Sequence, residues 1–245
     1  MTPAVMQLSH DLRQIHTVDG AWDRMQKELS RFGVESMFYG AAATRQDAAA
    51  LDARLIVWKS NHPQAYFDAF GVDHILENDL LAMQILEHSE PIRWHDDALW
   101  NNATPQQTAK ARIEADLGLN VGVVIPASHF EAYHLGGISL STPALSPRAF
   151  DRMWAEQSDE IITVCGLLDA CMRETYLAAI IHLSPREIEV LTWLASGLRP
   201  SQIAGRLKIG SHSVDKYINS ARAKLHAKTR DHAVAKALIY NIIHP

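Results

Sequence analysis

The stretch LSPRE at residues 183–187 marks the start of a helix, and it constrains the fold of this 245-residue chain more than any other segment. Ser184 can cap the helix, Pro185 suits its first position, and Glu187 stands where a capping box requires it. Apolar residues then recur at helical spacing until Gly197 ends the helix. The same criteria predict three further short helices, after residue 200, from residue 211 or 212, and over about 229–243. Residues 183–245 are therefore predicted to form an all-α, four-helix unit.

The second and third of these helices are joined by a tight turn at residues 209–211, which is the arrangement of a helix-turn-helix. Residues 183–245 carry ten basic and four acidic residues, a net charge of +6, whereas the rest of the chain has a net charge of −11. A basic unit of this kind suits a polyanion such as DNA. The alternative is an ordinary four-helix bundle with a solvated basic face. Charge, turn and helix lengths agree, so the pattern favours DNA binding.

The third helix is the predicted recognition helix, and its early residues are expected to reach base edges in the major groove. Asn219 can bond adenine and Asp215 can accept from cytosine, so these two are candidate specificity positions. The predicted DNA-binding residues are His212, Ser213, Asp215, Lys216, Asn219, Arg222 and Lys224. The basic side chains among them are expected to meet phosphates, which provide affinity and register.

This segment resembles the DNA-binding domain of LuxR-type (GerE-type) transcription factors. The matching positions are Glu187, Leu191, Gly197, Ile203, Ala204, Val214, Ala221, Lys224, Leu225, Arg230, Ala233 and Val234. Tyr217 departs from the pattern, because many relatives have His there, and it is still expected to pack inward.

Residues 1–172 read as short strands with helices on both sides. Helices are predicted at 19–32, 63–88 with a break near Gly71, 104–118 and 146–173, and strands at 36–42, 55–59, 119–125 and 134–141. The pattern predicts an α+β protein, with an N-terminal α/β/α sandwich around an antiparallel sheet. Residues 173–182 are the expected linker to the helix-turn-helix domain. No signal peptide or membrane span is visible, so a cytoplasmic protein without a membrane partner is expected.

No catalytic constellation is visible in the sequence, and the chain is not expected to be an enzyme. The 13 histidines lack metal-type pairing, and neither a phosphate loop nor a nucleophile elbow occurs, so no catalytic or metal site is predicted. Cys165 and Cys171 are expected to fill a core or a dimer surface. Two alternatives remain: an enzyme or storage domain with a DNA-binding tail, and a response regulator phosphorylated at Asp96 or Asp97. Receiver domains place such acidic residues near the start of the fold, unlike here.

Aromatic and polar side chains gather around residues 58–94 and suit a concave, mainly apolar ligand site. The candidate residues there are Trp58, His62, Tyr66, Phe70, Asp79 and Trp94. Spacing alone favours a simpler alternative, an aromatic core in which Asp79 caps a helix or faces water.

The segment is, however, similar to the acyl-homoserine-lactone-binding domain of the same LuxR-type family, with an Asp and a Trp in this order and a Gly at 122. The resemblance implies that Asp79 accepts the amide N–H of a quorum-sensing autoinducer and that Trp94 packs against its lactone ring. It also implies that Ser139 helps to bind the acyl carbonyl. If Asp79 were buried without a partner, ligand binding would relieve a desolvation cost and stabilise the fold.

Four residues depart from the family pattern: His62 stands for Tyr, Tyr66 for Trp, Phe70 for Tyr, and Leu80 for Pro. Tyr66 and His62 can still donate hydrogen bonds to a ligand, but Phe70 cannot replace a hydroxyl. The signal is therefore either a homoserine lactone held differently, with an unusual acyl or aryl group, or another small molecule. A regulator that acts without ligand is the remaining alternative.

The resemblance also implies the partners. We expect a homodimer, paired through helices 146–173 and 229–243, that binds a near-palindromic double-stranded operator. RNA polymerase is a further expected partner. No cofactor is expected besides the small-molecule autoinducer.

Overall fold

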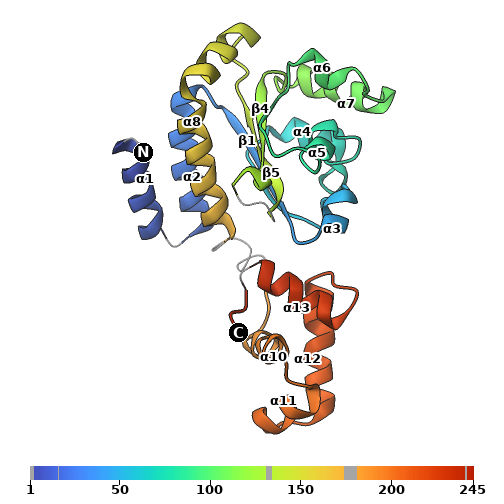
Figure 1. Ribbon diagram of the computed structural model, residues 1–245. Coiled ribbons are helices and arrows are strands. Elements are labelled where there is room, and N and C mark those ends of the chain that lie inside the picture. The colour runs from blue at the N-terminus through green and yellow to red at the C-terminus, as the bar shows by residue number, and fades with distance from the viewer. Residues whose placement is uncertain (1–2, 16, 131–133, 174–180, 241) are drawn as a thin grey trace. The chain divides into compact units, whose positions relative to one another are not determined.

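The chain divides into two units, Met1–Cys171 and Met172–Pro245, in the computed structural model (Figure 1). The structure describes residues 3–15, 17–130, 134–173, 181–240 and 242–245. Of the expected linker, residues 174–180 lie outside the described residues. The first unit combines an antiparallel sheet with helices and the second is helical, so the predicted fold class is confirmed.

A five-stranded sheet in the order β2-β1-β5-β4-β3 forms the centre of the first unit, and all neighbouring strands are antiparallel. The strands are β1 (Ser36–Ala42), β2 (Val57–Ser60), β3 (Ile92–Arg93), β4 (Gly122–Pro126) and β5 (Leu135–Ser141). The four predicted strands are thus confirmed within a few residues, whereas β3 lies outside the predicted set. Val124 stands opposite Ser139 in the β4–β5 pair.

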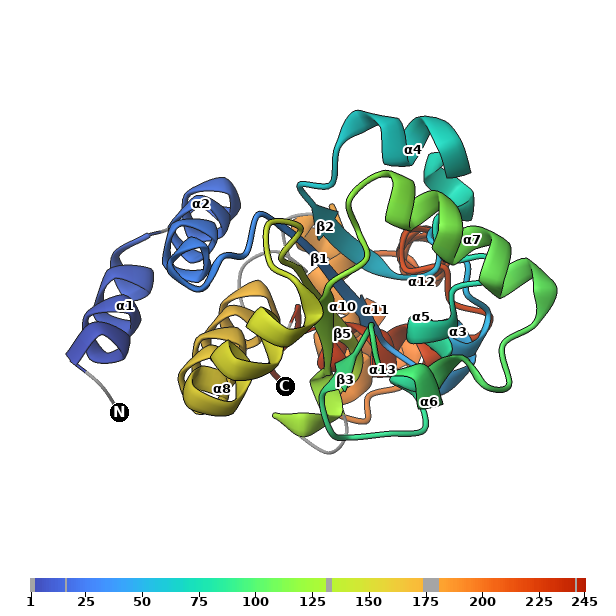
Figure 2. The same cartoon turned by 90° about the horizontal axis from the view of Figure 1, so that it is seen from above.

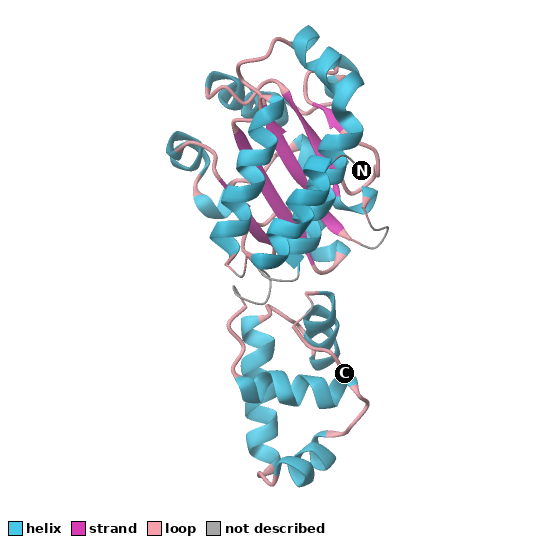
Figure 3. Ribbon diagram, turned by 90° about the vertical axis from the view of Figure 1, so that its left-hand side faces the viewer, coloured by secondary structure: helices cyan, strands magenta, loops and turns pink. Residues whose placement is uncertain are grey.

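The two faces of the sheet differ, because side chains alternate along each strand. On one face Tyr39 and Ile138 are fully buried, and the Tyr39 hydroxyl donates to Asp169 at 3.1 Å. This face is covered by the helices α2 (Val18–Leu29) and α8 (Pro147–Cys171), and α1 (Pro3–Gln14) packs against these two helices on the side away from the sheet (Figure 2). Figure 3 looks onto this helical layer, with the strands behind it. The opposite face of the sheet is covered by a different set of helices.

Short helices cover that opposite face: α3 (Arg45–Ala49), α4 (Gln64–Phe70), α5 (Leu80–Gln84), α6 (Asp97–Trp100) and α7 (Pro105–Asp116). The helical stretch predicted over 63–88 is broken near Gly71 as expected, but it ends earlier than predicted: α4 and α5 are separate helices with a 3-10 turn (Val72–His74) between them. Gly71 ends α4 at φ +73°, a value that side-chain-bearing residues rarely adopt. Helix α7 begins where the sequence predicts a helix start, with a capping box between Thr104 and Gln107.

Four helices make up the described part of the second unit: α10 (Pro185–Ala195), α11 (Pro200–Leu207), α12 (Ser211–Lys224) and α13 (Arg230–Ile239). The predicted capping box is present, with Glu187 and Ser184 bonded in both directions. The core contains Val190, Ile203, Ala204, Val214 and Ile218, and Tyr217 packs against it as predicted. Helix α13 ends earlier than the predicted residue 243. This core fixes α12 against α10 and α11.

Candidate functional site

A cavity of about 480 Å³ lies between the sheet and the covering helices α3 to α7. Five predicted ligand-binding residues line this cavity: His62, Tyr66, Asp79, Trp94 and Ser139. Aliphatic side chains make up much of the remaining wall, among them Leu51, Ile56, Leu81, Ile85 and Leu86. The cavity therefore combines a few polar groups with a broad apolar surface, which is the usual character of a small-molecule site.

Trp94 forms the part of the wall next to β4, with 7% of its surface exposed. Its indole lies against Gly122: a Cβ there would be 3.0 Å from two ring carbons and 2.1 Å from the Leu140 carbonyl oxygen. The Trp100 indole N–H donates to the Trp94 backbone carbonyl at 2.7 Å. Within the described part of the chain, the Trp94 indole nitrogen itself has no hydrogen-bond partner. The absence of a side chain at Gly122 thus sets the position of the Trp94 ring.

Tyr66 and His62 pack edge to face at the end of the cavity formed by α4, with ring centroids 4.9 Å apart. The Tyr66 hydroxyl donates to the Ile75 carbonyl at 3.4 Å, and burial raises the pKa of Tyr66 far above its usual range. Burial, together with the charge of Lys110, lowers the pKa of His62 to about 4. His62 is therefore a neutral ring near pH 7, with Nδ1 3.1 Å from the Ser36 hydroxyl.

Asp79 is the N-cap of α5, and its carboxylate accepts a hydrogen bond from the Ala82 backbone N–H at 2.9 Å. The ammonium of Lys110 lies 3.7 Å from its other oxygen. The expectation of a buried Asp79 without a partner is therefore wrong, since helix capping and a cation already compensate its burial. Asp79 caps a helix and lines the ligand cavity at the same time.

The other two predicted residues, Trp58 and Phe70, do not belong to the cavity lining. Trp58 stacks between Phe38 and Phe67, with centroid distances of 5.7 and 5.9 Å. Phe70 packs against Tyr66 at 5.0 Å, and the ammonium of Lys110 lies 4.2 Å from its ring centroid. These aromatics support the cavity wall from behind.

The sequence analysis missed the polar residues that α7 contributes. Lys110 is buried, with 5% of its side chain exposed, and it donates to the Ile75 carbonyl at 2.5 Å. Glu114 lines the cavity one helical turn later, 3.5 Å from Lys110 Nζ, and Arg112 lines it as well. A Lys–Glu pair four residues apart usually marks a solvent-exposed helix face, so the local pattern gave no sign of burial. The capping box at Thr104 and Gln107, which fixes the phase of α7, is the one sequence signal that bears on these positions.

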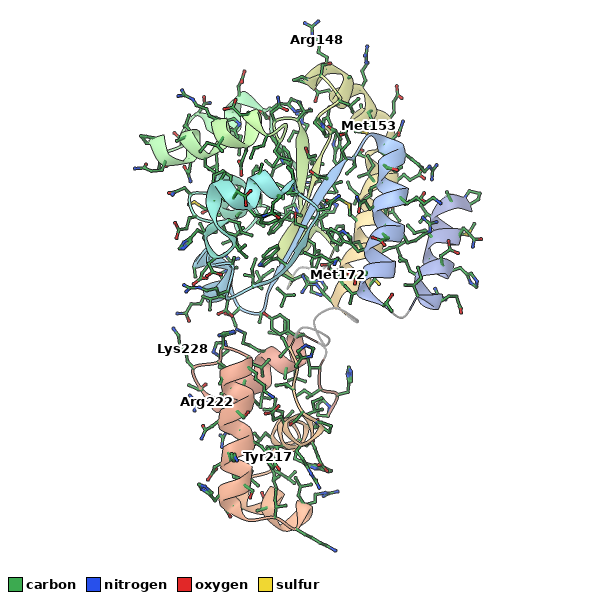
Figure 4. The ribbon with its side chains drawn as sticks, turned by 180° about the vertical axis from the view of Figure 1, so that it is seen from behind. Arg148, Met153, Met172, Tyr217, Arg222 and Lys228 are labelled. Carbon is green, nitrogen blue, oxygen red and sulfur yellow. The ribbon has the colours of Figure 1, made fainter. Side chains whose placement is uncertain are left out.

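On α12, the predicted DNA-facing residues lie along the outside of the helical unit. His212, Asp215, Lys216, Asn219 and Lys224 are exposed, whereas Ser213 and Arg222 are half-buried. Two of the basic residues already have partners within the unit. Lys224 pairs at 2.8 Å with the buried carboxylate of Glu187, and Arg222 donates to Asn219 Oδ1 at 3.1 Å and to the Lys228 carbonyl at 2.6 Å. Figure 4 shows Arg222 and Lys228 on one side of this unit.

The remaining predicted alternatives have ordinary structural surroundings. Asp96 caps α6 by accepting from the Ala98 backbone N–H at 3.1 Å, and Asp97 is the exposed first residue of that helix. Within the described residues, no three His, Cys, Asp or Glu side chains lie close enough together to hold a metal ion. No described helix is long and apolar enough to cross a membrane.

Two families of known domains match the chain. The autoinducer binding domain matches residues 17–171, and the domain of bacterial regulatory proteins of the luxR family matches residues 182–237.

The relatives are regulators of similar length. The transcriptional activator protein BjaR1 of Bradyrhizobium diazoefficiens is 22% identical, with 93% of this chain and 91% of that protein covered. The quorum sensing-dependent transcriptional regulator RpaR of Rhodopseudomonas palustris is 26% identical, with 88% of each covered. A solved structure of SdiA, an Escherichia coli protein, in complex with octanoyl-rac-glycerol has the same fold. Its TM-score is 0.54 at 18% identity, and 98% of this chain and 96% of that chain are covered.

Proposed function

Because the chain belongs to the luxR family of bacterial regulatory proteins and carries an autoinducer binding domain, we propose that it is a quorum-sensing transcription factor whose signal is an acyl- or aryl-homoserine lactone. One observation carries the proposal: a mainly apolar cavity has Asp79 and Trp94 in its wall, together with Ser139. Such a cavity suits a ligand with a small polar end and an apolar chain.

In this proposal each polar residue of the cavity meets one part of the ligand. Asp79 accepts the amide N–H, Trp94 packs against the lactone ring, and Ser139 donates to the acyl carbonyl. Neutral His62 and the Tyr66 hydroxyl are the candidate donors to the remaining carbonyl. The aliphatic side chains hold the acyl or aryl group, whose burial supplies about 25 cal/mol per Å² of apolar surface.

DNA recognition is proposed for α12 in a homodimer bound to a near-palindromic operator, with α8 and α13 as the dimer surfaces. His212, Ser213, Asp215 and Asn219 would face base edges, and Lys216 would meet a phosphate. Arg222 and Lys224 would have to leave or share their present partners to reach phosphates. RNA polymerase is the proposed further partner, and the cytoplasm is the proposed compartment.

A second candidate is a regulator of the same architecture with a signal that is not a lactone. The Tyr66 hydroxyl favours this candidate, because it donates to the Ile75 carbonyl at 3.4 Å and would have to leave that partner to donate to a lactone carbonyl. The ligand in the SdiA structure, octanoyl-rac-glycerol, is such a molecule.

Mass spectrometry of small molecules extracted from the protein, purified from its native host, tests the signal class. Recovery of a homoserine lactone supports the first candidate, and recovery of another apolar metabolite supports the second. If no small molecule is extracted and the protein binds DNA as well without added ligand as with it, both candidates are contradicted. Asp79→Asn is the matched variant, because Asn keeps the helix cap and removes the carboxylate. We expect lactone affinity to fall roughly 10- to 100-fold, the loss of one charged hydrogen bond, with little change in the melting temperature of the empty protein.

A further inference from the structure

The cavity wall contains two carboxyl groups, those of Asp79 and Glu114, which share the ammonium of Lys110. The Lys110 Nζ lies 3.7 Å from the nearer Asp79 oxygen and 3.5 Å from the nearer Glu114 oxygen. Its shortest contact is with a third group, the Ile75 carbonyl at 2.5 Å. One buried cation thus serves three acceptors and does not saturate the hydrogen-bonding capacity of either carboxylate, each of which has about four lone-pair sites.

Glu114 is the less satisfied of the two. Asp79 also accepts from the Ala82 backbone N–H, whereas among the described residues Lys110 is the one ion-pair partner of the Glu114 side chain. Burial, reinforced by the charge of Asp79, raises the pKa of Glu114 to about 7, although Lys110 opposes this shift. A partly buried carboxyl with spare acceptor capacity faces a cavity that accommodates a ligand.

The donors around this end of the cavity are mostly engaged by the protein itself. The Tyr66 hydroxyl donates to the Ile75 carbonyl, and the Trp100 indole donates to the Trp94 carbonyl. His62 has one ring nitrogen within 3.1 Å of the Ser36 hydroxyl. Trp94, Arg112 and Ser139 also line the cavity and carry donor groups. The two carboxyl groups accept hydrogen bonds when ionised, and a ligand with few donors would leave one of them without a partner.

We propose that Asp79 and Glu114 together select a signal whose polar end presents two hydrogen-bond donors, either an amide N–H with a hydroxyl or two hydroxyls, joined to an apolar chain. The inference rests on the proposed function, because it takes the cavity to be the signal site. It goes further in giving Glu114 a direct contact with the ligand and in making Lys110 a positioning residue, which holds both carboxyls at the cavity wall.

Four ligands of equal chain length test this inference by calorimetric titration of the full-length protein. Octanoyl-homoserine lactone and its 3-oxo form each have one donor, whereas the 3-hydroxy form and octanoyl glycerol each have two. We expect the two-donor ligands to bind at least about tenfold more tightly, since a hydrogen bond to a charged group contributes roughly 1.5–3 kcal/mol. Equal affinity across the four ligands, or binding by none, overturns the inference. Extraction from the native host judges the proposed function separately.

Variants at Glu114 test whether this residue causes the preference for two-donor ligands. Glu114→Leu should remove the preference for two donors, while the isosteric Glu114→Gln should keep part of the preference. The matched control is Asp116→Asn, an exposed carboxylate on the same helix, which should change neither. A uniform loss for all four ligands in Glu114→Leu overturns the proposal, because it indicates a structural role. If Glu114→Leu does not fold, Glu114→Gln and the pH profile decide.

The pH dependence of ligand affinity separates a direct contact from a packing role, because a packing role of Glu114 would not make the affinity change with pH. A ligand donor favours ionised Glu114, so the affinity for the two-donor ligands should rise between pH 6 and 8, around a pKa of about 7. The charged or titratable groups that interact with Glu114 are Asp79, Lys110 and Tyr66. Arg112 and His62 line the same cavity, and the pKa of His62, about 4, keeps that ring neutral over this range. The profile should be flat in Glu114→Gln. A flat profile in the wild type overturns the proposed contact.

Discussion

The ion pair between Glu187 and Lys224 joins the first helix of the C-terminal unit to the end of α12, at 2.8 Å. Burial alone would raise the pKa of Glu187, which is 3% exposed, but hydrogen bonds from Lys224, Ser220 and Ser184 outweigh it and lower the pKa from 4.5 to about 2. Because each unit of pKa difference is worth about 1.4 kcal/mol, this difference corresponds to about 3 kcal/mol. The Lys224 side chain is 40% exposed, so solvent screening lowers the value to about 2 kcal/mol.

Glu187→Gln is the perturbation that isolates this charge, because Gln also completes a capping box. We expect the C-terminal unit to lose about 2 kcal/mol of its free energy of unfolding at pH 7, so hydrogen-exchange protection of the slowest amides in α10 and α12 should fall about 30-fold. The folded-state pKa lies below the unfolded one. The stabilisation is therefore present above about pH 4.5 and disappears as the pH falls toward 2.

Hydrogen exchange followed by mass spectrometry, at pH 7, 4 and 2.5, measures both the magnitude and its pH dependence. Wild type and variant are compared at the same pH, so the intrinsic exchange rate cancels. The matched control is Glu189→Gln, which breaks the exposed pair with Arg186, whose side chains are 51% and 39% exposed, and which should cost less than about 0.5 kcal/mol. Equal losses in the two variants, or a difference that persists at pH 2.5, would refute the reasoning.

Two further predictions concern the sheet and the DNA-facing helix. Gly122→Ala should lower the melting temperature by about 4–8 °C, since a Cβ 2.1 Å from the Leu140 carbonyl oxygen forces a backbone shift costing about 2 kcal/mol. Gly205→Ala, where a Cβ meets open space, is its control and should not destabilise. Lys216→Ala should weaken DNA binding and reduce the salt slope by about one at an unchanged melting temperature, whereas Lys224→Ala should also lower thermal stability. Lys216 does not contact DNA if its loss leaves the salt slope unchanged.

Local signals in the sequence predicted much of the fold. The capping boxes at Ser184 and Thr104 need only residues three positions away, so they mark helix starts wherever the chain is placed. Strand β1 has the predicted bounds. Its signal, a run of small and apolar residues between turn signals, is local and does not depend on the neighbouring strands. Helix α1 lies outside the predicted helices. Its apolar residues Val5, Leu8 and Leu12 are buried, and α1 lies against α8, a contact far away in sequence.

The candidate site was predicted less completely. Asp79 and Trp94 were identified through family resemblance, and the structure brings both into one cavity wall. The same residue types, considered by spacing alone, favoured a helix cap for Asp79, and Asp79 does cap α5. The departures at Tyr66 and Phe70 were visible in the sequence, but their contacts with Ile75 and Lys110 were not.

The sequence by itself determined where several of the helices and strands begin, the separation of a basic helix-turn-helix from an acidic body, and the family. These properties depend on neighbours along the chain or on composition. The tertiary structure alone decided that Lys110 is buried, bonded to a carbonyl 35 residues away, and that Glu114 faces the cavity with Asp79. Burial and electrostatic environment are sums over residues from many parts of the chain, so no local pattern on α7 could have predicted them.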